Sequence, residues 1–438
     1  MNTHPSATER AEAITAAIPA DGLFHEKTWR VSPDPFPISA LLARRLDRLG
    51  RHLARFVEAC SRLDRMSRDG RQPAWIAELL DRGKPARLVE LQSEKSLSTA
   101  LPKVLRPDLV LHGDTFTIAE IDSVPGGIGL TDWLNFTYDA AGSLVLGGPN
   151  GMLDGFASIF PGGDIVVSEE AATYRPEMRW LAARLNARFP DSRWDLCDLP
   201  DLTSTRIYRF FEMFDLANIP GATAVVEAAA MGLLEMTPPP RPALEEKLWF
   251  ALFWLRPLEP FWLRALGGRT LRFLRECIPM TWLLDPSPLP AHAAIPGLEI
   301  HSWEEVAAFS QKDRGLILKI SGFSENAWGT RGVVLGSDLP APAWKDALRA
   351  ALDAWPSSPH ILQKFHPGSL IEHPFLEGNA IHNLRGRVRL CPYYFVKDPA
   401  SPRLGGALAT ICPDDKKLLH GMKDAILVPS GLPGMDAD

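Results

Sequence analysis

Four charged residues in one short stretch of the chain are the best candidates for chemistry: Arg106, Asp108, Glu120 and Asp122. Carboxylates that share one face of a strand repel one another and raise each other's pKa. Mg²⁺ relieves such repulsion, because it binds one or two protein carboxylates and completes its octahedron with waters and phosphate oxygens. Asp108, Glu120 and Asp122 are therefore candidate metal ligands. The alternative is a solvent-facing strand with a surface Arg–Glu pair.

A β-hairpin should position these residues. Its expected strands are 109–111 and 116–121, and its expected turn is 112–114. Because side chains alternate along a strand, Glu120 and Asp122 project from the same face. A three-residue turn pairs Asp108 with Ile118 and Arg106 with Glu120, which places Asp108 diagonal to Glu120 at roughly 7–8 Å. A two-residue turn would move Asp108 to the opposite face, so the register decides whether the carboxylates meet.

A second candidate site begins at Lys319, in the apolar strand expected at 316–320. A lysine there is unfavourable unless an anion receives it. The following segment, Ser321–Gly332, offers small residues and backbone N–H groups that can cover phosphates. The segment has neither a P-loop motif nor a Rossmann fingerprint, so a strand–loop–strand cover remains. The alternative is an ordinary hairpin in which Lys319 reaches water.

Two further strands carry polar residues that could contact a nucleotide. The strand expected at 360–365 ends in Gln363, Lys364 and Phe365, which could present groups to a purine edge or form an edge strand without a ligand. Arg387 and Arg389 share one face of the segment 386–396, which includes the strand expected at 388–396. They could clamp a transferring phosphoryl group or bridge to acidic neighbours.

The remaining periodicity indicates a mixed α/β or α+β protein. Between 164 and 196 a strand, helix and strand follow in turn, which predicts a small parallel sheet. The expected helices lie at 38–63, with an arginine-rich outer face and a break at Gly50, and at 175–189, 224–234 and 344–354. The other expected strands lie at 207–213, 332–335 and 407–411, and the segment 245–284 is expected to be helical. In that segment five residues either line a substrate pocket or fill a core, and helical spacing favours the core: Trp249, Trp254, Arg256, Trp262 and Trp282.

Composition excludes several classes of protein. The 438 residues are 46% hydrophobic and 23% charged, which is typical of a globular chain and not of a disordered one. A net charge of −6 argues against a general nucleic-acid binder. The five cysteines form no CxxC pair, which indicates a reducing compartment. The N-terminus lacks a signal-peptide pattern. The apolar stretch 248–255 is too short to span a bilayer, so we expect a buried helix there. We therefore expect a cytoplasmic protein without a membrane or nucleic-acid partner.

Together these motifs resemble the ATP-grasp enzymes, and specifically the circularly permuted branch that includes glutathionylspermidine synthase. In that branch an Arg-x-Asp precedes Glu-x-Asn by a dozen residues, and both precede the lysine strand. Arg106-Pro107-Asp108, Glu120-Ile121-Asp122 and Lys319 follow that order, and Ile207–Phe210 and Glu246-Lys247-Leu248 are also similar. The likeness covers roughly 106 to 429. The chain departs from the branch in having Asp122 where asparagine is usual and in lacking a recognisable amidase domain.

The resemblance implies a permuted ATP-grasp fold with a helical N-terminal region (1–100), a metal-binding hairpin and loop (101–163), a small Rossmann-like α/β subdomain (164–245) and nucleotide-binding lobes (246–438). It implies an ATP- and Mg²⁺-dependent ligase that joins a small-molecule or peptide-like acid to an amine through an acyl phosphate. Asp108, Glu120 and Asp122 would bind Mg²⁺, and Arg106 and Arg389 would steady the phosphoryl group. The nucleotide would contact residues of the loop and its flanking strands: Lys247, Lys319, Gly329, Arg331, Gly332, Gln363, Lys364 and Phe365.

Two other functions fit the same motifs. A small-molecule phosphotransferase would use the same nucleotide site without forming an amide. A non-catalytic nucleotide-binding protein would bind ATP without turnover, and Asp122 in place of asparagine keeps that reading open.

Overall fold

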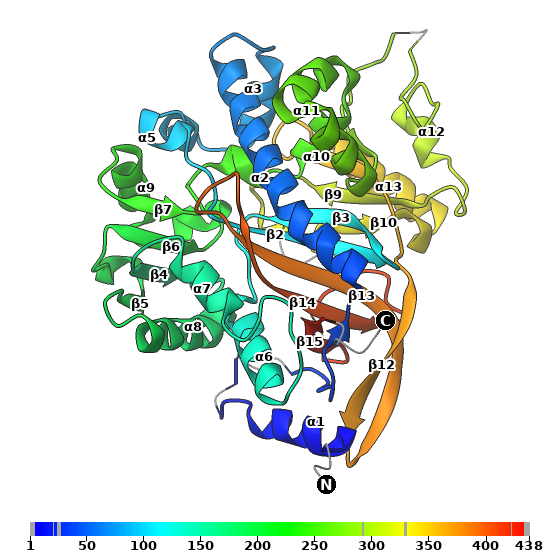
Figure 1. Ribbon diagram of the computed structural model, residues 1–438. Helices are drawn as coiled ribbons and strands as arrows, with labels where there is room; N and C mark the ends of the chain where they lie inside the picture. Colours follow the sequence, from blue (N-terminus) through cyan, green and yellow to red (C-terminus); the bar gives the residue numbers. More distant parts are fainter. Residues whose placement is uncertain are drawn as a thin grey trace. The chain divides into compact units, whose positions relative to one another are not determined.

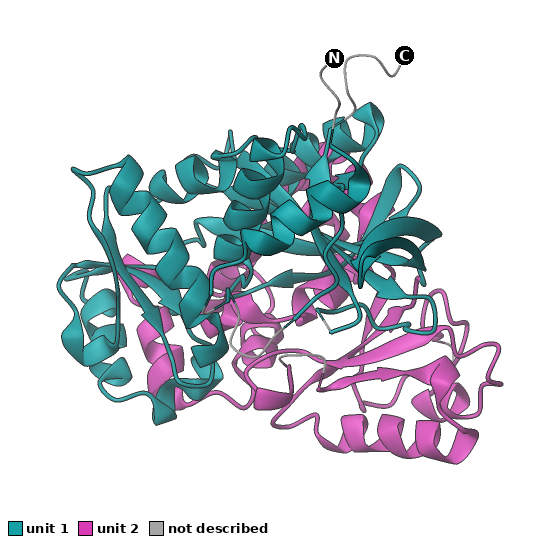
Figure 2. Ribbon diagram, turned by 90° about the horizontal axis from the view of Figure 1, so that it is seen from below, with its two compact units in different colours: residues 1–57, 100–240, 367–438 teal, residues 58–99, 241–366 magenta. Residues whose placement is uncertain are grey.

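The computed structural model describes residues 5–20, 22–23, 28–290, 293–327, 331–421 and 423–432 (Figure 1). The chain divides into two compact units (Figure 2). Unit 1 contains residues 1–57, 100–240 and 367–438, and unit 2 contains residues 58–99 and 241–366. The four-part division expected from the sequence stays a prediction.

Unit 1 carries the longer strands. Its helices are α1 (Ala7–Ala16), the first part of α2 (Ala40–Arg68), α6 (Ile128–Ala140), α7 (Gly151–Ala157), α8 (Arg175–Arg188) and α9 (Ala222–Ala230). Its strands are β1 (Phe36–Pro37), β2 (Val104–His112), β3 (Thr115–Asp122), β4 (Gly163–Val167), β5 (Trp194–Cys197), β6 (Arg206–Phe210), β7 (Glu235–Thr237), β12 (Leu370–Glu377), β13 (Ala380–Phe395), β14 (Arg403–Pro413) and β15 (Ile426–Gly431).

Unit 2 combines short helices with one small sheet. Its helices are the end of α2, α3 (Trp75–Asp81), α4 (Ala86–Gln92), α5 (Lys95–Ser98), α10 (Leu248–Trp254), α11 (Glu259–Cys277), α12 (Trp303–Ala307) and α13 (Ala341–Asp353). Its strands are β8 (Thr281–Leu283), β9 (Leu316–Ile320), β10 (Val333–Leu335) and β11 (His360–Lys364). The segment expected to be helical up to 284 therefore ends in a strand, because Thr281–Leu283 pairs with β11.

The large sheet of unit 1 has the strand order β1-β15-β14-β13-β2-β3, and β12 also pairs with β13. Helix α2 covers one face, where the Tyr394 hydroxyl donates to the carbonyl oxygen of Leu46 at 2.6 Å. The helix continues through Gly50 instead of breaking there. A Cβ at Gly50 would lie 2.5 Å from Cδ1 of Tyr394, so the missing side chain is what allows this close approach. Helices α6 and α7 pack against β14 in the same unit.

The β2–β3 hairpin differs from the expected register. Its turn has two residues, so His112 pairs with Thr115, and Gly113 has the positive φ of 60° that such a tight turn requires. A bulge between Asp108 and Leu109 then shifts the register. Beyond this bulge Asp108 lies directly opposite Glu120, and Arg106 lies opposite Asp122 rather than Glu120. The extra bulged residue thus returns the carboxylates to one face, which a regular two-residue hairpin would not do.

The expected small parallel sheet is confirmed in unit 1. Its order is β5-β4-β6-β7, and all three neighbouring pairs run parallel. Helix α8 connects β4 to β5 and contributes Met178, Leu181 and Leu185 to the core. Strand β6 ends at Phe210, earlier than the expected Met213, because a 3-10 turn begins at Met213.

The sheet of unit 2 is antiparallel, in the order β10-β9-β11-β8. One face packs on α12 and α13 through a core that includes Leu318, Trp344 and Leu362. The expected buried helix at 248–255 is confirmed as α10, whose residues from Leu248 to Phe253 are buried. Among the described residues, none of the helices has the length and apolar character needed to cross a membrane.

Candidate functional site

A cluster of charged groups in unit 1 surrounds Asp108 on β2. Its Oδ1 lies 3.1 Å from Nη2 of Arg106 and accepts a hydrogen bond from Sγ of Cys391 at 3.3 Å. Its Oδ2 accepts from Nη1 of Arg389 at 3.1 Å. Burial, and to a smaller extent the negative charge of Asp108, raises the pKa of Cys391 to about 12. The thiol therefore keeps its proton and acts as a hydrogen-bond donor. Strand β13 supplies Arg389 and Cys391 from alternate positions on one face.

Asp122 forms the other half of the cluster. Arg106 makes an ion pair with Asp122 as well as with Asp108, and the Val124 N–H donates to Oδ1 of Asp122 at 3.1 Å. Burial raises the pKa of Asp122 to about 6, with Asp108 and Glu120 adding to the rise and Arg106 opposing it. Burial is the largest cause of this rise, and the attraction of Arg106 does not offset it.

The carboxylates of this cluster are of the type that a hard divalent cation prefers. Within the cluster three carboxylates face two guanidinium groups, and Asp122 and Glu120 interact electrostatically. Both oxygens of Asp108 already contact Arg106, Arg389 or Cys391. In the described part of the chain no group of three or more His, Cys, Asp or Glu side chains has the geometry of a complete metal site. A bound Mg²⁺ would therefore rely on one or two carboxylates and on waters or phosphate oxygens.

The glycine-rich turn after β3 is held by side chains of unit 1. Arg106 Nη1 and the Tyr393 hydroxyl both donate to the Gly126 carbonyl, at 3.0 and 2.6 Å. Gly127 has φ 83°, and its N–H donates to Oε1 of Glu177 at 2.8 Å, while the Leu130 N–H donates to Oε2 at 3.0 Å. Glu177 is fully buried. Its carboxylate therefore occupies the N-terminus of α6.

In unit 2 a row of buried polar side chains crosses the sheet from β9 to β8. Lys319 Nζ donates to Oε1 of Gln363 at 3.0 Å, and Gln363 Nε2 donates to Thr281 Oγ1 at 3.1 Å. The three residues are at most 5% exposed. The strand expected around Lys319 is confirmed from 316 to 320. The Gln363 amide oxygen thus accepts a hydrogen bond from the buried lysine.

Lys364 and Phe365 have their backbone N–H groups in use. The Lys364 N–H donates to the Met280 carbonyl, and the Phe365 N–H donates to the Gly315 carbonyl, each at 2.9 Å. Any adenine contact at these residues would therefore use side chains or carbonyl oxygens.

The loop after β9 contacts the segment that precedes α10. Lys247 Nζ donates to the Ala327 carbonyl at 3.1 Å. Gly332 allows close packing, since a Cβ there would lie 2.4 Å from the Asn326 carbonyl oxygen. Arg331 is exposed, and the candidate Gly329 lies outside the described residues. The candidate metal and arginine residues thus belong to unit 1, and the described nucleotide candidates belong to unit 2.

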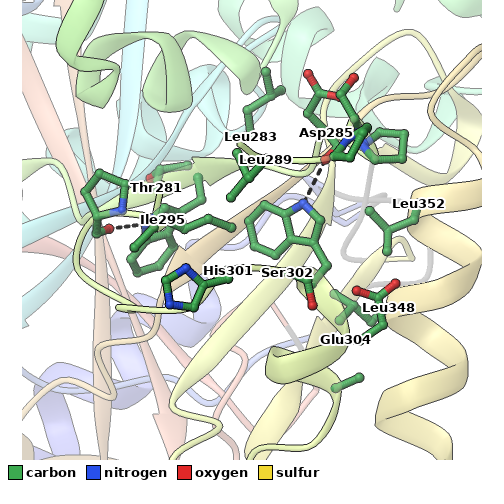
Figure 3. Close-up of a pocket in the computed structure, with 18 of the residues that line it drawn as sticks. Thr281, Leu283, Asp285, Leu289, Ile295, His301, Ser302, Glu304, Leu348 and Leu352 are labelled. Carbon is green, nitrogen blue, oxygen red and sulfur yellow. Dashed lines mark hydrogen bonds between the residues drawn. The ribbon is translucent and has the colours of Figure 1, made fainter. Parts of the chain in front are cut away.

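Unit 2 also contains a cavity of about 1390 Å³ beside β8, the edge strand of its sheet. Its lining includes Leu283, Leu289 and Ile295, with His301 close by (Figure 3). Three of the five residues considered either pocket lining or core contribute to it: Trp254, Arg256 and Trp282. The other two, Trp249 and Trp262, are in the core.

Sequence reasoning missed several residues that hold the candidate sites. Cys391 and Glu177 were overlooked because a single cysteine or glutamate in an amphipathic segment carries no spacing signal. Thr281 was placed in a helix. Lys84 lies in a loop and forms a buried ion pair with Glu246 in unit 2, a contact between segments far apart in the chain. The alternation on β13 could have revealed Cys391, since it shares a face with Arg389.

Comparison with solved structures identifies the fold. The apo structure of a glutathione synthetase-like effector from Globodera pallida matches over 97% of this chain and 97% of its own, with a TM-score of 0.58 and 10% sequence identity. The chain shares the fold of that effector. At this identity the likeness concerns the fold alone.

A proposed gamma-glutamylcysteine synthetase from Methylobacillus flagellatus aligns over 88% of this chain and 87% of its own at 13% identity. Its TM-score of 0.39 is too low to support an argument. No protein-family model matches the sequence. No curated protein matches it either.

Proposed function

We propose that this protein is an ATP- and Mg²⁺-dependent ligase that joins a small-molecule or peptide-like carboxylate to an amine. The observation that carries the proposal is the cluster of Arg106, Asp108, Glu120, Asp122 and Arg389 on one face of unit 1. Carboxylates and guanidinium groups side by side suit a site that binds both a metal cation and a phosphoryl group. The shared fold with a glutathione synthetase-like effector supports a ligase of this type.

Glu120 and Asp122 are the proposed metal ligands, and Asp108 stays a third candidate whose oxygens now orient Arg106 and Arg389. Mg²⁺, when bound, neutralises charge on the β- and γ-phosphates of ATP. The paired arginines hold the acid substrate or the transferring phosphoryl group, because a guanidinium forms directional bonds to planar or phosphate oxygens.

In unit 2, Lys319 is the proposed contact to the triphosphate. Its ammonium is nearly buried, and an anionic phosphate is a favourable partner for a buried positive charge. We assign Lys247, Arg331 and Gly332 to the same phosphates, and we assign the side chains or carbonyl groups of Gln363–Phe365 to adenine. The order of the hairpin before the lysine strand supports a circularly permuted ATP-grasp arrangement.

The proposed reaction has two steps. A carboxylate oxygen of the acid attacks the γ-phosphorus, the bond from this phosphorus to the β,γ-bridging oxygen breaks, and ADP leaves. The amine nitrogen then attacks the acyl carbon, the carbon–oxygen bond to phosphate breaks, and the amine proton passes to solvent or phosphate. Positioning and charge neutralisation carry both steps.

Hydroxylamine trapping tests this proposal. The protein is incubated with ATP, Mg²⁺ and a panel of amino acids and short peptides that includes glutathione and its building blocks. Hydroxamate and ADP formed together with one acid support the ligase. A stable phosphorylated product instead supports the phosphotransferase, and ATP binding without turnover supports the non-catalytic protein. A Lys319→Met variant should lose activity, and Lys312→Met, an exposed lysine nearby, serves as the control.

A further inference from the structure

A buried ion pair lies at the base of the loop that follows β9. Lys84, in the turn between α3 and α4, contacts Oε1 of Glu246, and their side chains are only 1% and 3% exposed. The ammonium also donates to the Leu80 carbonyl at 2.5 Å. All of these residues belong to unit 2. Neither residue is among the candidate metal, phosphoryl or nucleotide contacts named above.

The second carboxylate oxygen of Glu246 connects the ion pair to the loop. It accepts a hydrogen bond from the hydroxyl of Ser321, the first residue after β9. The same hydroxyl accepts from the Leu248 N–H at 2.9 Å, and the Ser321 carbonyl accepts from the Lys247 N–H at 3.0 Å. Three consecutive residues, 246–248, therefore fix one fully buried serine.

The next residues of the loop are equally constrained. A Cβ at Gly322 would lie 3.0 Å from the Glu245 carbonyl oxygen and from the Glu246 carboxyl group. Phe323 has φ 44°, a conformation that bulky residues adopt only when their surroundings impose it. The Lys84 ammonium lies 5.8 Å from the centre of the Phe323 ring. Glu246 thus lies against the loop at Ser321 and Gly322, and Lys84 lies near it at Phe323.

Removing one member of this set has a predictable consequence. A buried charge without its partner is strongly unfavourable, so the remaining group must move toward water or become neutral. Either change removes or weakens the hydrogen bond between Glu246 and the Ser321 hydroxyl. The path of residues 321–327 would then depend on weaker local bonds.

We propose that Lys84 and Glu246 are positioning residues that set the course of residues 321–327 and thereby the affinity for the ATP triphosphate. The link to ATP rests on the proposed function. The link to the loop does not, because it follows from contacts within unit 2. The proposal adds to the phosphate-binding machinery a lysine that lies far upstream of Lys319 in the chain.

Hydrogen–deuterium exchange on the full-length protein tests the loop directly. Ser321→Ala removes the hydroxyl and keeps the ion pair, and Lys84→Met removes the ammonium. Both should raise amide exchange in 321–327 at least tenfold, whereas Arg87→Met, which breaks an exposed ion pair with Glu90, should leave it unchanged. A double variant, Lys84→Met with Glu246→Leu, avoids an unpaired buried charge if Lys84→Met alone fails to fold.

A fluorescent ATP analogue provides the second readout. Ser321→Ala should weaken its binding at least tenfold without lowering the melting temperature in proportion, which a merely structural role would not produce. Unchanged exchange in folded Ser321→Ala and in the folded Lys84 variant overturns the proposal. If exchange rises but the wild-type protein binds no nucleotide, the positioning of the loop stands and the proposed ligase function fails.

Discussion

Substitution of Asp122 by asparagine should remove a pH dependence of the free energy of unfolding that arises from the shifted pKa of this carboxyl group. The pKa of Asp122 is raised from 3.8 to about 6, chiefly by burial. A carboxyl group with a higher pKa in the folded chain binds its proton more tightly when folded. Its contribution to the free energy of unfolding is therefore full below pH 3.8 and is lost as the pH rises through about 6.

The size of the effect follows from the two pKa values. A difference of about two pKa units, at about 1.4 kcal/mol each, corresponds to about 3 kcal/mol in total. About 2 kcal/mol of this falls between pH 4.5 and 7.5. The Asp122→Asn variant lacks the titrating group, and its amide oxygen can still accept from the Val124 N–H. Relative to the variant, the wild-type protein should lose about 2 kcal/mol over this interval.

Urea denaturation in the presence of EDTA measures this difference. Free energies of unfolding are compared at pH 4.5, 6 and 7.5, and Asp191→Asn, at an exposed position of the same unit, serves as the control. Parallel pH profiles for the wild-type protein and Asp122→Asn would refute the reasoning. Replacing EDTA with Mg²⁺ at pH 7.5 should stabilise the wild-type protein more than the variant, because a bound cation favours the ionised carboxylate.

Three other changes have equally definite outcomes. Burial lowers the pKa of His373 from 6.5 to about 4, so its contribution to the free energy of unfolding is full above pH 6.5. About 3 kcal/mol of that free energy is lost as the pH falls through 4, and chemical denaturation of His373→Gln should show no such loss. Lys319→Met should reduce nucleotide affinity at least tenfold in titration calorimetry. An unchanged affinity would contradict this. Gly50→Ala should lower the free energy of unfolding by about 1–3 kcal/mol in chemical denaturation, because the alanine Cβ would clash with the Tyr394 ring. A more stable variant would show that the higher helix propensity of alanine outweighs the clash.

Local patterns were sufficient for much of the fold. The apolar runs predicted β9, α10 and the parallel sheet of unit 1, because periodicity and burial coincide there. Strands β12 and β15 were missed. Strand β12 carries a proline and exposed positions, and β15 is held by pairing with β14, which no local pattern encodes.

The candidate sites show the same limit at the level of single residues. The types and order of Arg106, Asp108, Glu120 and Asp122 were visible in the sequence, but their register depended on a bulge that has no sequence signature. The ion pair of Lys84 with Glu246 could not be predicted, because no pattern in the sequence between them indicates that the two residues are in contact. Long-range packing decides such pairs, and it becomes visible only in three dimensions.

The buried carboxylate of Glu177 has a consequence for where phosphate can bind. The amide groups at the start of α6 would otherwise form a natural receptor for an anion. Here the Glu177 carboxylate already accepts hydrogen bonds from the amide groups of Gly127 and Leu130 and occupies that position. If the proposed function holds, the triphosphate would be bound by cationic side chains and metal and not by this helix terminus.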